Sequence, residues 1–299
     1  MRTEHAPTIR RADYRPLAWT VDTVELYFSL DTEATIVRNT MRMTRQGDGP
    51  LVLLHEGLMR EELTVNGVVP RQLRDEDGRI EIDLDGEQSV EVVVVTRINP
   101  SANTELSGLY QSAGGLFTQC EAEGFRRITC FPDRPDVMAR YTVTLEADKR
   151  AYPVLLSNGN RVDAGDLEAG RHFAKWEDPF RKPSYLFALV AADLVVLDRT
   201  VTTMSGREVL PQVYVEDGNL DRADHAMDSL VHALRWDETT FGLELDLDRY
   251  MIVAVGDFNM GAMENKGLNI FNAKYVLAKP QTATDVDYEH IESVVAHEY

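Results

Sequence analysis

Residues 249–255 read Arg-Tyr-Met-Ile-Val-Ala-Val, a nearly continuous apolar run. A short run with so few polar residues is typical of a strand that is buried on both faces. A glycine-rich turn region follows over residues 256–267, and residues 268–271 predict a further strand. This stretch therefore predicts the beginning of a mixed α/β domain in the C-terminal part of the chain.

Two predicted helices flank this stretch. The first has Asn219 or Asp221 as its N-cap and Gly242 beyond its end, and the second opens at Thr284 or Asp285. Apolar residues at helical spacing in the first helix are Ala223, Ala226, Met227, Leu230, Val231 and Leu234. Those in the second are Ile291, Val294 and Val295. Each pattern indicates a helix with one buried face.

The part of the chain before these helices is rich in short strands. Alternation of apolar and polar residues predicts a strand over residues 21–30. Further short extended segments are predicted over residues 34–43, 51–54, 61–65, 80–84, 90–96, 126–131, 140–145, 185–190 and 194–197. Turn dipeptides of the hairpin type separate some of them, namely Asn66-Gly67, Asp77-Gly78, Asp85-Gly86 and Asn158-Gly159. The spacing predicts a mainly β domain over residues 1–193, as a β-sandwich or a saddle-like sheet, followed by the α/β part over residues 194–299.

Composition and charge argue against several classes of protein. The 299 residues are 43% hydrophobic and 27% charged, which is ordinary for a globular protein. The net charge of −19 argues against nucleic-acid binding and against an anionic membrane surface. An acidic cleft would instead attract cationic groups, such as the free amino terminus of a peptide. No apolar run approaches the ~20 residues that span a bilayer.

The opening of the chain and its cysteines bear on the compartment. Residues 1–5 begin a polar segment without the apolar core of a secretory signal, so we expect a cytoplasmic location. Cys120 and Cys130 are the only two cysteines. We expect both thiols to be reduced and to fill core positions, because two cysteines do not complete a four-ligand structural zinc site.

The chain ends on His297-Glu298-Tyr299, where a patterned helix leads into a His-Glu pair. In the pattern His-Glu-x-x-His, two histidines one turn apart bind zinc, and the glutamate takes a proton from the metal-bound water. Only the first histidine of that pattern is present in these 299 residues. We therefore expect this chain by itself to hold no catalytic zinc and to have no peptidase activity.

Two further segments carry candidate binding residues. Glu264 follows Gly261-Ala262-Met263 in a glycine-flanked loop, where a carboxylate can bind an ammonium group, although physical reasoning on these residues alone favours a solvated loop glutamate. Glu121 and Glu123 point to one side if residues 119–127 are extended, and Arg126 or Arg127 can pair with them. The alternative for this second segment is a surface cluster of ion pairs.

These segments together resemble a known family. The residues that carry the resemblance are Gln119 to Phe131, Gly261-Ala262-Met263-Glu264-Asn265 and His297-Glu298-Tyr299. They are similar to the zinc-dependent aminopeptidase N (alanyl aminopeptidase) family, in particular its bacterial cytoplasmic members. The resemblance extends from about residue 21 to the end and is most specific over residues 251–271. It implies that the α/β part is the start of a thermolysin-like catalytic domain, cut inside the zinc motif.

The resemblance also implies roles for single residues. His297 matches the first zinc ligand, and Glu298 matches the general base. Glu264 matches the glutamate that anchors the free α-amino group of a peptide, and Gln119 and Glu121 match residues of the first domain that share this task.

Three further residues match positions that contact the rest of the substrate. The backbone at Gly261 and Ala262 matches a strip that pairs with the bound peptide, and Met260 matches an apolar lining of the pocket for its first side chain. The implied function is hydrolysis of single amino-terminal residues from peptides, with one zinc ion in the full-length enzyme. The implied partners are peptides with a free amino terminus and the remainder of the protein's own polypeptide.

Two alternatives stay open at this point. One is a non-catalytic relative that uses the β-rich domain as an interaction scaffold. The other is the epoxide-hydrolysing branch of the same broad family. Ala262 argues against this branch, because its motif more often has glycine at that position. We also expect residues 1–193 to fold alone and residues 194–299 to be unstable in isolation, since their apolar face would lack partners.

Overall fold

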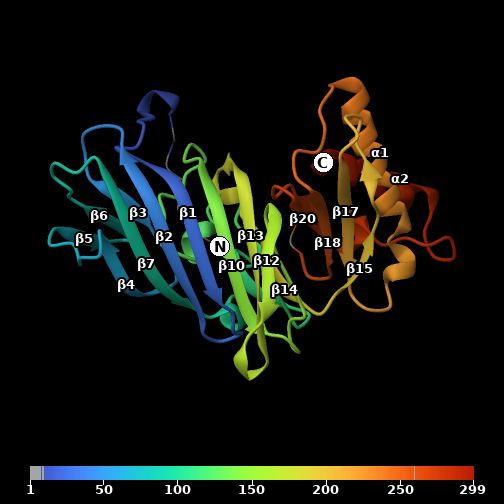
Figure 1. Ribbon diagram of the computed structural model, residues 1–299, viewed down its shortest axis with the longest axis horizontal. Helices are drawn as coiled ribbons and strands as arrows, with labels where there is room; N and C mark the ends of the chain where they lie inside the picture. Colours follow the sequence, from blue (N-terminus) through green and yellow to red (C-terminus); the bar gives the residue numbers. More distant parts are fainter. Residues whose placement is uncertain (1–7, 9, 259) are drawn as a thin grey trace.

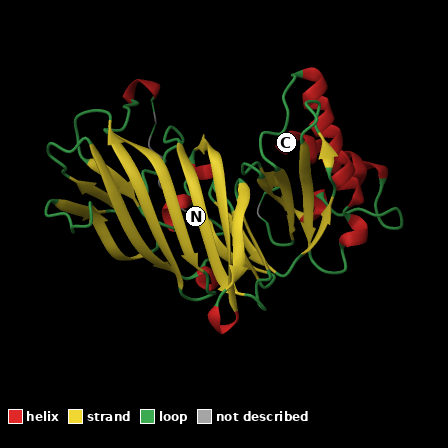
Figure 2. Cartoon of the chain, in the orientation of Figure 1, coloured by secondary structure: helices red, strands yellow, loops and turns green. Residues whose placement is uncertain are grey.

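The computed structural model describes residue 8, residues 10–258 and residues 260–299. It is dominated by strands, and the two long helices lie in the C-terminal part (Figure 2). The predicted fold class, a mainly β first part followed by the start of an α/β part, is confirmed. None of the helices in the described residues is long and apolar enough to cross a membrane.

A large sheet forms the left half of the molecule in Figure 1. Its strand order is β12-β13-β10-β1-β2-β7-β4, and neighbours are antiparallel except for β1 and β10. In chain order its strands are β1 (Trp19–Ser29), β2 (Thr35–Arg45), β4 (Met59–Val65), β7 (Ser89–Ile98), β10 (Ala139–Asp148), β12 (Asn160–Asp166) and β13 (Arg171–Lys182). Alternate residues such as Leu26 and Phe28 point into the core, which is why the period of two predicted these strands.

Two smaller sheets cover the buried face of the large one. The first, in the order β11-β14-β9-β8, contains β8 (Gly108–Ser112), β9 (Gly115–Gln119), β11 (Val154–Ser157) and β14 (Leu189–Ala192). The second, in the order β3-β6-β5, contains β3 (Leu51–Leu54), β5 (Leu73–Glu76) and β6 (Arg79–Ile82). Phe125 and Phe187 lie between the layers with their ring centroids 5.2 Å apart.

A separate sheet forms the C-terminal part. It runs β15-β17-β18-β20-β19, with β16 paired to β17, and its central strands β17, β18 and β20 are parallel. The strands are β15 (Val195–Asp198), β16 (Val201–Thr202), β17 (Glu208–Val215), β18 (Arg249–Val255), β19 (Ala262–Met263) and β20 (Leu268–Asn272). The apolar run that predicted a buried strand over residues 249–255 is β18, and its Met251, Ile252 and Val253 are fully buried.

The helices α1 (Asp224–Thr240) and α2 (Asp285–Glu298) pack against each other and form a second core with one face of this sheet. Thr284 is the N-cap of α2 and forms a capping box with Asp287, as the sequence predicted for its start. The N-cap prediction for α1 is wrong. A turn of 3-10 helix occupies Leu220–Arg222, and α1 begins after Ala223 without a side-chain cap.

Two segments expected to be extended are not. Residues 125–127 form a turn of 3-10 helix that overlaps the start of the predicted strand 126–131, because Asp133 accepts hydrogen bonds from the backbone and side chain of Arg126. Residues 184–186 form another such turn, so only the last part of the segment 185–190 lies in a strand. Apolar content alone does not distinguish a buried turn from a buried strand.

Not all of the predicted turn dipeptides form hairpins. Asp77-Gly78 joins β5 and β6 in a two-residue hairpin, as predicted. Asn158-Gly159 does not form a hairpin, because β11 before it pairs with β14 in one sheet and β12 after it pairs with β13 in another. Asp85-Gly86 likewise connects two sheets.

The two parts of the chain share a core. Met251, Val255 and Phe258 of the C-terminal part belong to the same buried cluster as the strands of the first part. The four-stranded sheet ends at Ala192 and the next sheet begins at Val195. The domain boundary at residue 193 stays a prediction.

Candidate functional site

Three separate elements carry the predicted site residues. Gln119 ends β9, and Glu121 lies in the turn that follows it. Glu264 follows the short strand β19 directly. His297 and Glu298 lie in the last turn of α2, which packs against β19. Asn259, at the start of the predicted loop motif, lies outside the described residues.

The electrostatic environment of Glu298 indicates that these three elements lie close together. Burial raises the pKa of the Glu298 carboxyl above its ordinary value, and the negative charges of Glu264 and Glu121 raise it further. The imidazole of His297 opposes this shift. The structure therefore brings together the three carboxylates and the histidine, although they lie up to 177 positions apart in the chain, from residue 121 to residue 298.

The first part of the chain reaches into the site through Gln119. Its side chain is almost completely buried, and Nε2 donates hydrogen bonds to Sδ of Met260 at 3.3 Å and to the carbonyl oxygen of Glu121 at 3.4 Å. Oε1 of Gln119 is buried without a hydrogen-bond partner among the described residues. This oxygen is an acceptor that a bound donor group can use.

The segment 119–127 is not extended. Residues 121–124 form a turn, so Glu121 and Glu123 do not share a face in the way that an alternating strand would place them. Glu123 instead pairs with Arg126 at 3.2 Å, and Arg126 also pairs with Asp133 at 3.1 Å. The interpretation as a surface ion pair therefore holds for Glu123. Glu121 has no such partner in the described part of the chain, and its negative charge contributes to the raised pKa of Glu298.

The strand β19 is the edge of its sheet. Among the residues that the structure describes, it pairs on one side only, antiparallel to β20, and the backbone N–H of Asn272 donates to the carbonyl oxygen of Gly261 at 2.9 Å. An edge strand presents unpaired backbone groups to which an extended peptide can add. Met260, just before this edge, is 39% exposed.

Sequence reasoning missed the residues that hold the end of α2. Asn269 of β20 donates to the carbonyl oxygen of Glu298 at 3.3 Å and to the hydroxyl of Tyr250 on β18. The ring of Tyr250 also lies 5.3 Å from that of Tyr299, centroid to centroid. A polar residue between the apolar residues Leu268 and Ile270 of a buried strand is the signal that identifies Asn269 as a bonded, buried group.

The residues present do not complete a metal site. Among residues 8, 10–258 and 260–299, no group of three or more His, Cys, Asp or Glu side chains is arranged to hold an ion. His297 is exposed and lines a cavity of about 380 Å³ between α1 and α2. A catalytic zinc takes three protein ligands, so His297 would need two more beside it to complete such a site.

Both cysteines are free and buried, as expected for core residues. Burial raises the pKa of Cys130 to about 12 and that of Cys120 well above its ordinary value. Neither thiol is therefore a candidate nucleophile.

Two family models match the chain. The model for the peptidase M1 N-terminal domain matches residues 58–186, and the model for the peptidase family M1 domain matches residues 225–299. The first covers the strands from β4 to β13, and the second covers α1, α2 and the strands between them.

Relatives of known name are similar over nearly the whole chain. Aminopeptidase N of Escherichia coli is 54% identical over 97% of this chain, and aminopeptidase N of Caulobacter vibrioides is 52% identical over all of it. The crystal structure of Legionella pneumophila aminopeptidase A in complex with aspartic acid superposes with a TM-score of 0.91 at 33% identity, over 96% of this chain. The chain spans 33%, 35% and 34% of these three relatives, about a third of their length.

Proposed function

The chain belongs to peptidase family M1, and on that premise we propose that it contributes the amine-binding part of a zinc aminopeptidase. The proposed reaction is hydrolysis of the first peptide bond of peptides with a free amino terminus. The observation that carries this proposal is a contact between the two parts of the chain: Nε2 of Gln119, two residues before Glu121, donates to Sδ of Met260, four residues before Glu264, at 3.3 Å.

The charge of the site selects the substrate class. Repulsion among neighbouring carboxylates is relieved by a bound cation, and the ammonium at the start of a peptide is such a cation. Oε1 of Gln119, which has no partner among the described residues, is available to accept a further hydrogen bond from the same ammonium. A longer chain would present an uncharged amide at this place and would leave the carboxylates unpaired, so the site favours an exopeptidase.

The strand β19 supports the orientation of the peptide. A peptide that extends the sheet at β19 pairs with backbone groups of Gly261 and Ala262, and Glu264 lies directly beyond that strand. The pairing sets the register, and the carboxylates set which end of the peptide is accepted. Burial and the neighbouring carboxylates raise the pKa of Glu298, which makes its carboxylate a better proton acceptor and suits the role of a general base.

We include zinc in the proposal because the relatives of this chain belong to a family of zinc-dependent aminopeptidases. When bound, it polarises a carbonyl group and lowers the pKa of a water molecule to about 7. Within this chain His297 is the residue proposed to bind it. We propose that the 299-residue chain alone does not retain zinc, and metal analysis after dialysis tests this. Stoichiometric zinc that is lost in His297→Ala would contradict it.

The aminopeptidase proposal is tested on the polypeptide continued to the full length of its relatives. Hydrolysis of an aminoacyl reporter is compared with that of the same reporter N-acetylated. We expect the free amine to be strongly preferred, and Glu264→Gln to lower kcat/KM by about 10- to 100-fold, as for loss of a charge-assisted hydrogen bond. A non-catalytic scaffold would cleave neither reporter. Equal rates on both would remove the amine-binding role from Glu264.

We also propose a cytoplasmic location and no nucleic-acid or membrane partner. The two free, buried thiols and the net charge of −19 support this. Fractionation of cells that express the tagged protein tests the location, and recovery in a membrane or secreted fraction would contradict it.

A further inference from the structure

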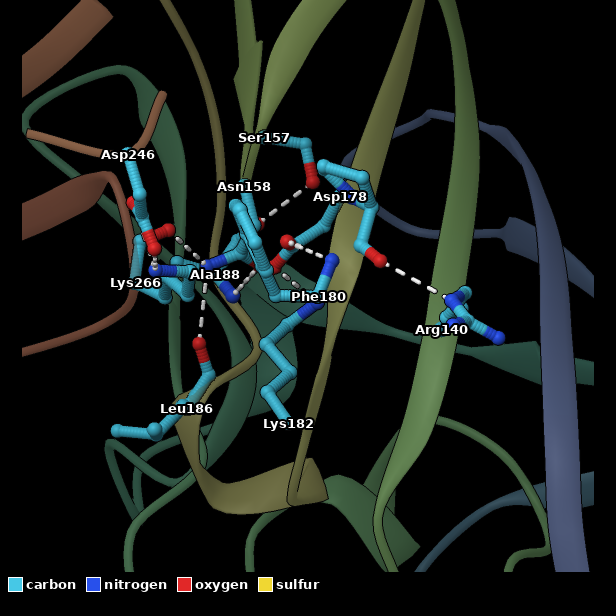
Figure 3. A network of polar contacts seen from close by, with 11 residues as sticks. Arg140, Ser157, Asn158, Asp178, Phe180, Lys182, Leu186, Ala188, Asp246 and Lys266 are labelled. Atoms are coloured by element: carbon cyan, nitrogen blue, oxygen red, sulfur yellow. Dashed lines mark hydrogen bonds and ion pairs between the residues drawn. The ribbon is translucent and has the colours of Figure 1, made fainter.

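Asn158 lies where the two parts of the chain meet. Its side chain is 1% exposed and uses its amide group in three hydrogen bonds, drawn in Figure 3. Nδ2 donates to the carbonyl oxygens of Leu186 and Lys266, each at 2.9 Å, and Oδ1 accepts from the backbone N–H of Ala188 at 2.8 Å. One buried amide therefore joins its own turn to two other backbone segments: residues 186–188, in the first part of the chain, and Lys266, in the C-terminal sheet region.

The turn that carries Asn158 cannot shift easily. Gly159 has a φ of +88°, and a Cβ added there would lie 2.1 Å from the carbonyl oxygen of Glu177. Gly267, next to Lys266, has a φ of +73°, and its added Cβ would lie 3.6 Å from the backbone nitrogen of Gly159. Two glycine turns from the two parts thus pack directly against each other, because neither carries a side chain.

Lys266 is held by its side chain as well as by its carbonyl group. Nζ pairs with both carboxylate oxygens of Asp246, at 2.8 Å and 3.0 Å, and lies 4.7 Å from the ring centroid of Phe180 on β13 (Figure 3). Glu264 lies two residues before Lys266 in the chain. The hydrogen bond from Asn158 therefore ties the backbone beside Glu264 to the β-rich part of the chain, which also carries Glu121.

We propose that Asn158 is a positioning residue for the amine-binding carboxylates. By holding the Lys266 carbonyl group against the β-rich part, it sets the separation between Glu264 and Glu121, and with it the affinity for a substrate's ammonium group. This inference rests on the proposed function. Placement matters because binding groups must be held within about 0.5 Å of the productive geometry, and Asn158 supplies that support without touching the substrate.

The test uses the full-length enzyme and the variant Asn158→Ala. The readout is the ratio of two inhibition constants, for an α-amino acid and for the same acid without its amine, which isolates recognition of the ammonium. We expect the preference for the amine to fall by about fivefold to tenfold, with KM for an aminoacyl reporter rising by a similar factor and kcat changing less.

Asn103→Ala is the matched control. Nδ2 of Asn103 also donates to two carbonyl oxygens, those of Ser107 and Leu109, each at 2.8 Å, but all three residues lie in the first part of the chain. We expect it to lower the melting temperature without changing the inhibition ratio. Asn158→Ser is measured in parallel, since a hydroxyl is too short to hold both carbonyl groups and this variant keeps the test usable if the alanine variant does not fold.

Glu264→Gln separates the two hypotheses. If Glu264→Gln leaves the ratio unchanged, the proposed function fails. If Glu264→Gln lowers the ratio but neither Asn158 variant does, the positioning role is overturned. If Asn158 acts through Glu264, its substitution has no further effect on the ratio in the Glu264→Gln background, and additive effects would also overturn the inference.

Discussion

Glu298 in the last turn of α2 and Glu264 beyond β19 lie close enough for the charge of Glu264 to raise the pKa of Glu298. Two like charges that are brought together only in the folded chain weaken its stability. Functional sites commonly contain such destabilising repulsion, because side chains arranged to bind a ligand are unfavourably placed when the ligand is absent. The relationship yields a prediction about stability that needs no catalytic assay.

Glu264→Gln is expected to stabilise this chain at neutral pH. A raised carboxyl pKa in the folded state means that stability falls as pH rises from the ordinary glutamate pKa through the folded value. Removing the charge of Glu264 removes part of that loss. The gain in free energy of unfolding, measured by urea denaturation at pH 7, should disappear when the pH falls below about 4, because Glu298, whose pKa is raised, is then protonated and no longer repelled by Glu264.

Glu25→Gln is the control for this measurement, since Glu25 is exposed on β1 of the large sheet. It removes the same charge from the chain's net balance without touching the site. An equal stabilisation by both variants would attribute the effect to net charge and not to the pair.

The buried pair of Lys182 and Asp178 supports a second prediction. Nζ of Lys182 lies 3.0 Å from Oδ2 of Asp178 and 3.8 Å from the ring centroid of Tyr141, and the lysine side chain is 1% exposed. Lys182→Met leaves a buried carboxylate without its partner and should destabilise by about 3–5 kcal/mol. In Lys182→Met/Asp178→Leu the loss should be smaller than in the single variant. A double variant that is less stable than Lys182→Met would contradict this account.

The same pair predicts a dependence on pH. Burial lowers the pKa of Lys182 to about 8, against the opposing attraction of Asp178. Between pH 8 and about 10.4, the ordinary lysine pKa, the unfolded chain binds more protons than the folded chain, so this group makes stability rise with pH. The difference in unfolding free energy between the wild type and the double variant should increase over that range. A flat difference would show that Lys182 titrates normally.

Gly159 supports a prediction about backbone geometry. Gly159→Ala combines a left-handed φ with a clash of 2.1 Å against the carbonyl oxygen of Glu177. Gly114→Ala is matched to it, since Gly114 has a φ of +81° and nothing lies within 4 Å of an added Cβ. The Gly114 variant should lose about 1–3 kcal/mol from strain alone, and the Gly159 variant clearly more. Equal urea midpoints would show that the turn at Gly159 relaxes.

The start of α2 supports a further prediction. Thr284 accepts from the backbone N–H of Asp287, whose carboxylate accepts from the backbone N–H of Thr284 in return. Thr284→Ala should cost about 1 kcal/mol in unfolding free energy. Val286→Ala in the same turn is the control, because Val286 is 54% exposed and alanine favours a helix. Equal losses in the two variants would argue against the cap.

Local patterns of the sequence were enough to predict much of the fold. The apolar run of residues 249–255 coincides with β18, and the threonine before α2 is its cap. These features depend on neighbours within a few residues, which is the range over which propensity and capping act. The loop motif around Glu264 and the pair His297-Glu298 were likewise identified from short motifs, while their roles stay proposals.

Contacts between distant residues decided the rest. Asn158-Gly159 has the sequence of a hairpin turn, yet β11 and β12 pair with different sheets, and its amide binds Lys266, 108 positions away. The 3-10 turn at residues 125–127, which ends the segment expected to be extended, is held by Asp133, which accepts from the backbone and side chain of Arg126.

The sequence by itself determined which segments extend or coil and which residues can carry charge at a binding site, because these are properties of a residue and its near neighbours. Only the tertiary structure decided that the charges of Glu121 and Glu264 act on Glu298 and that Asn158 binds the carbonyl oxygen of Lys266. Electrostatic and hydrogen-bond energies depend on distances in space, and the order of residues along the chain does not specify those distances.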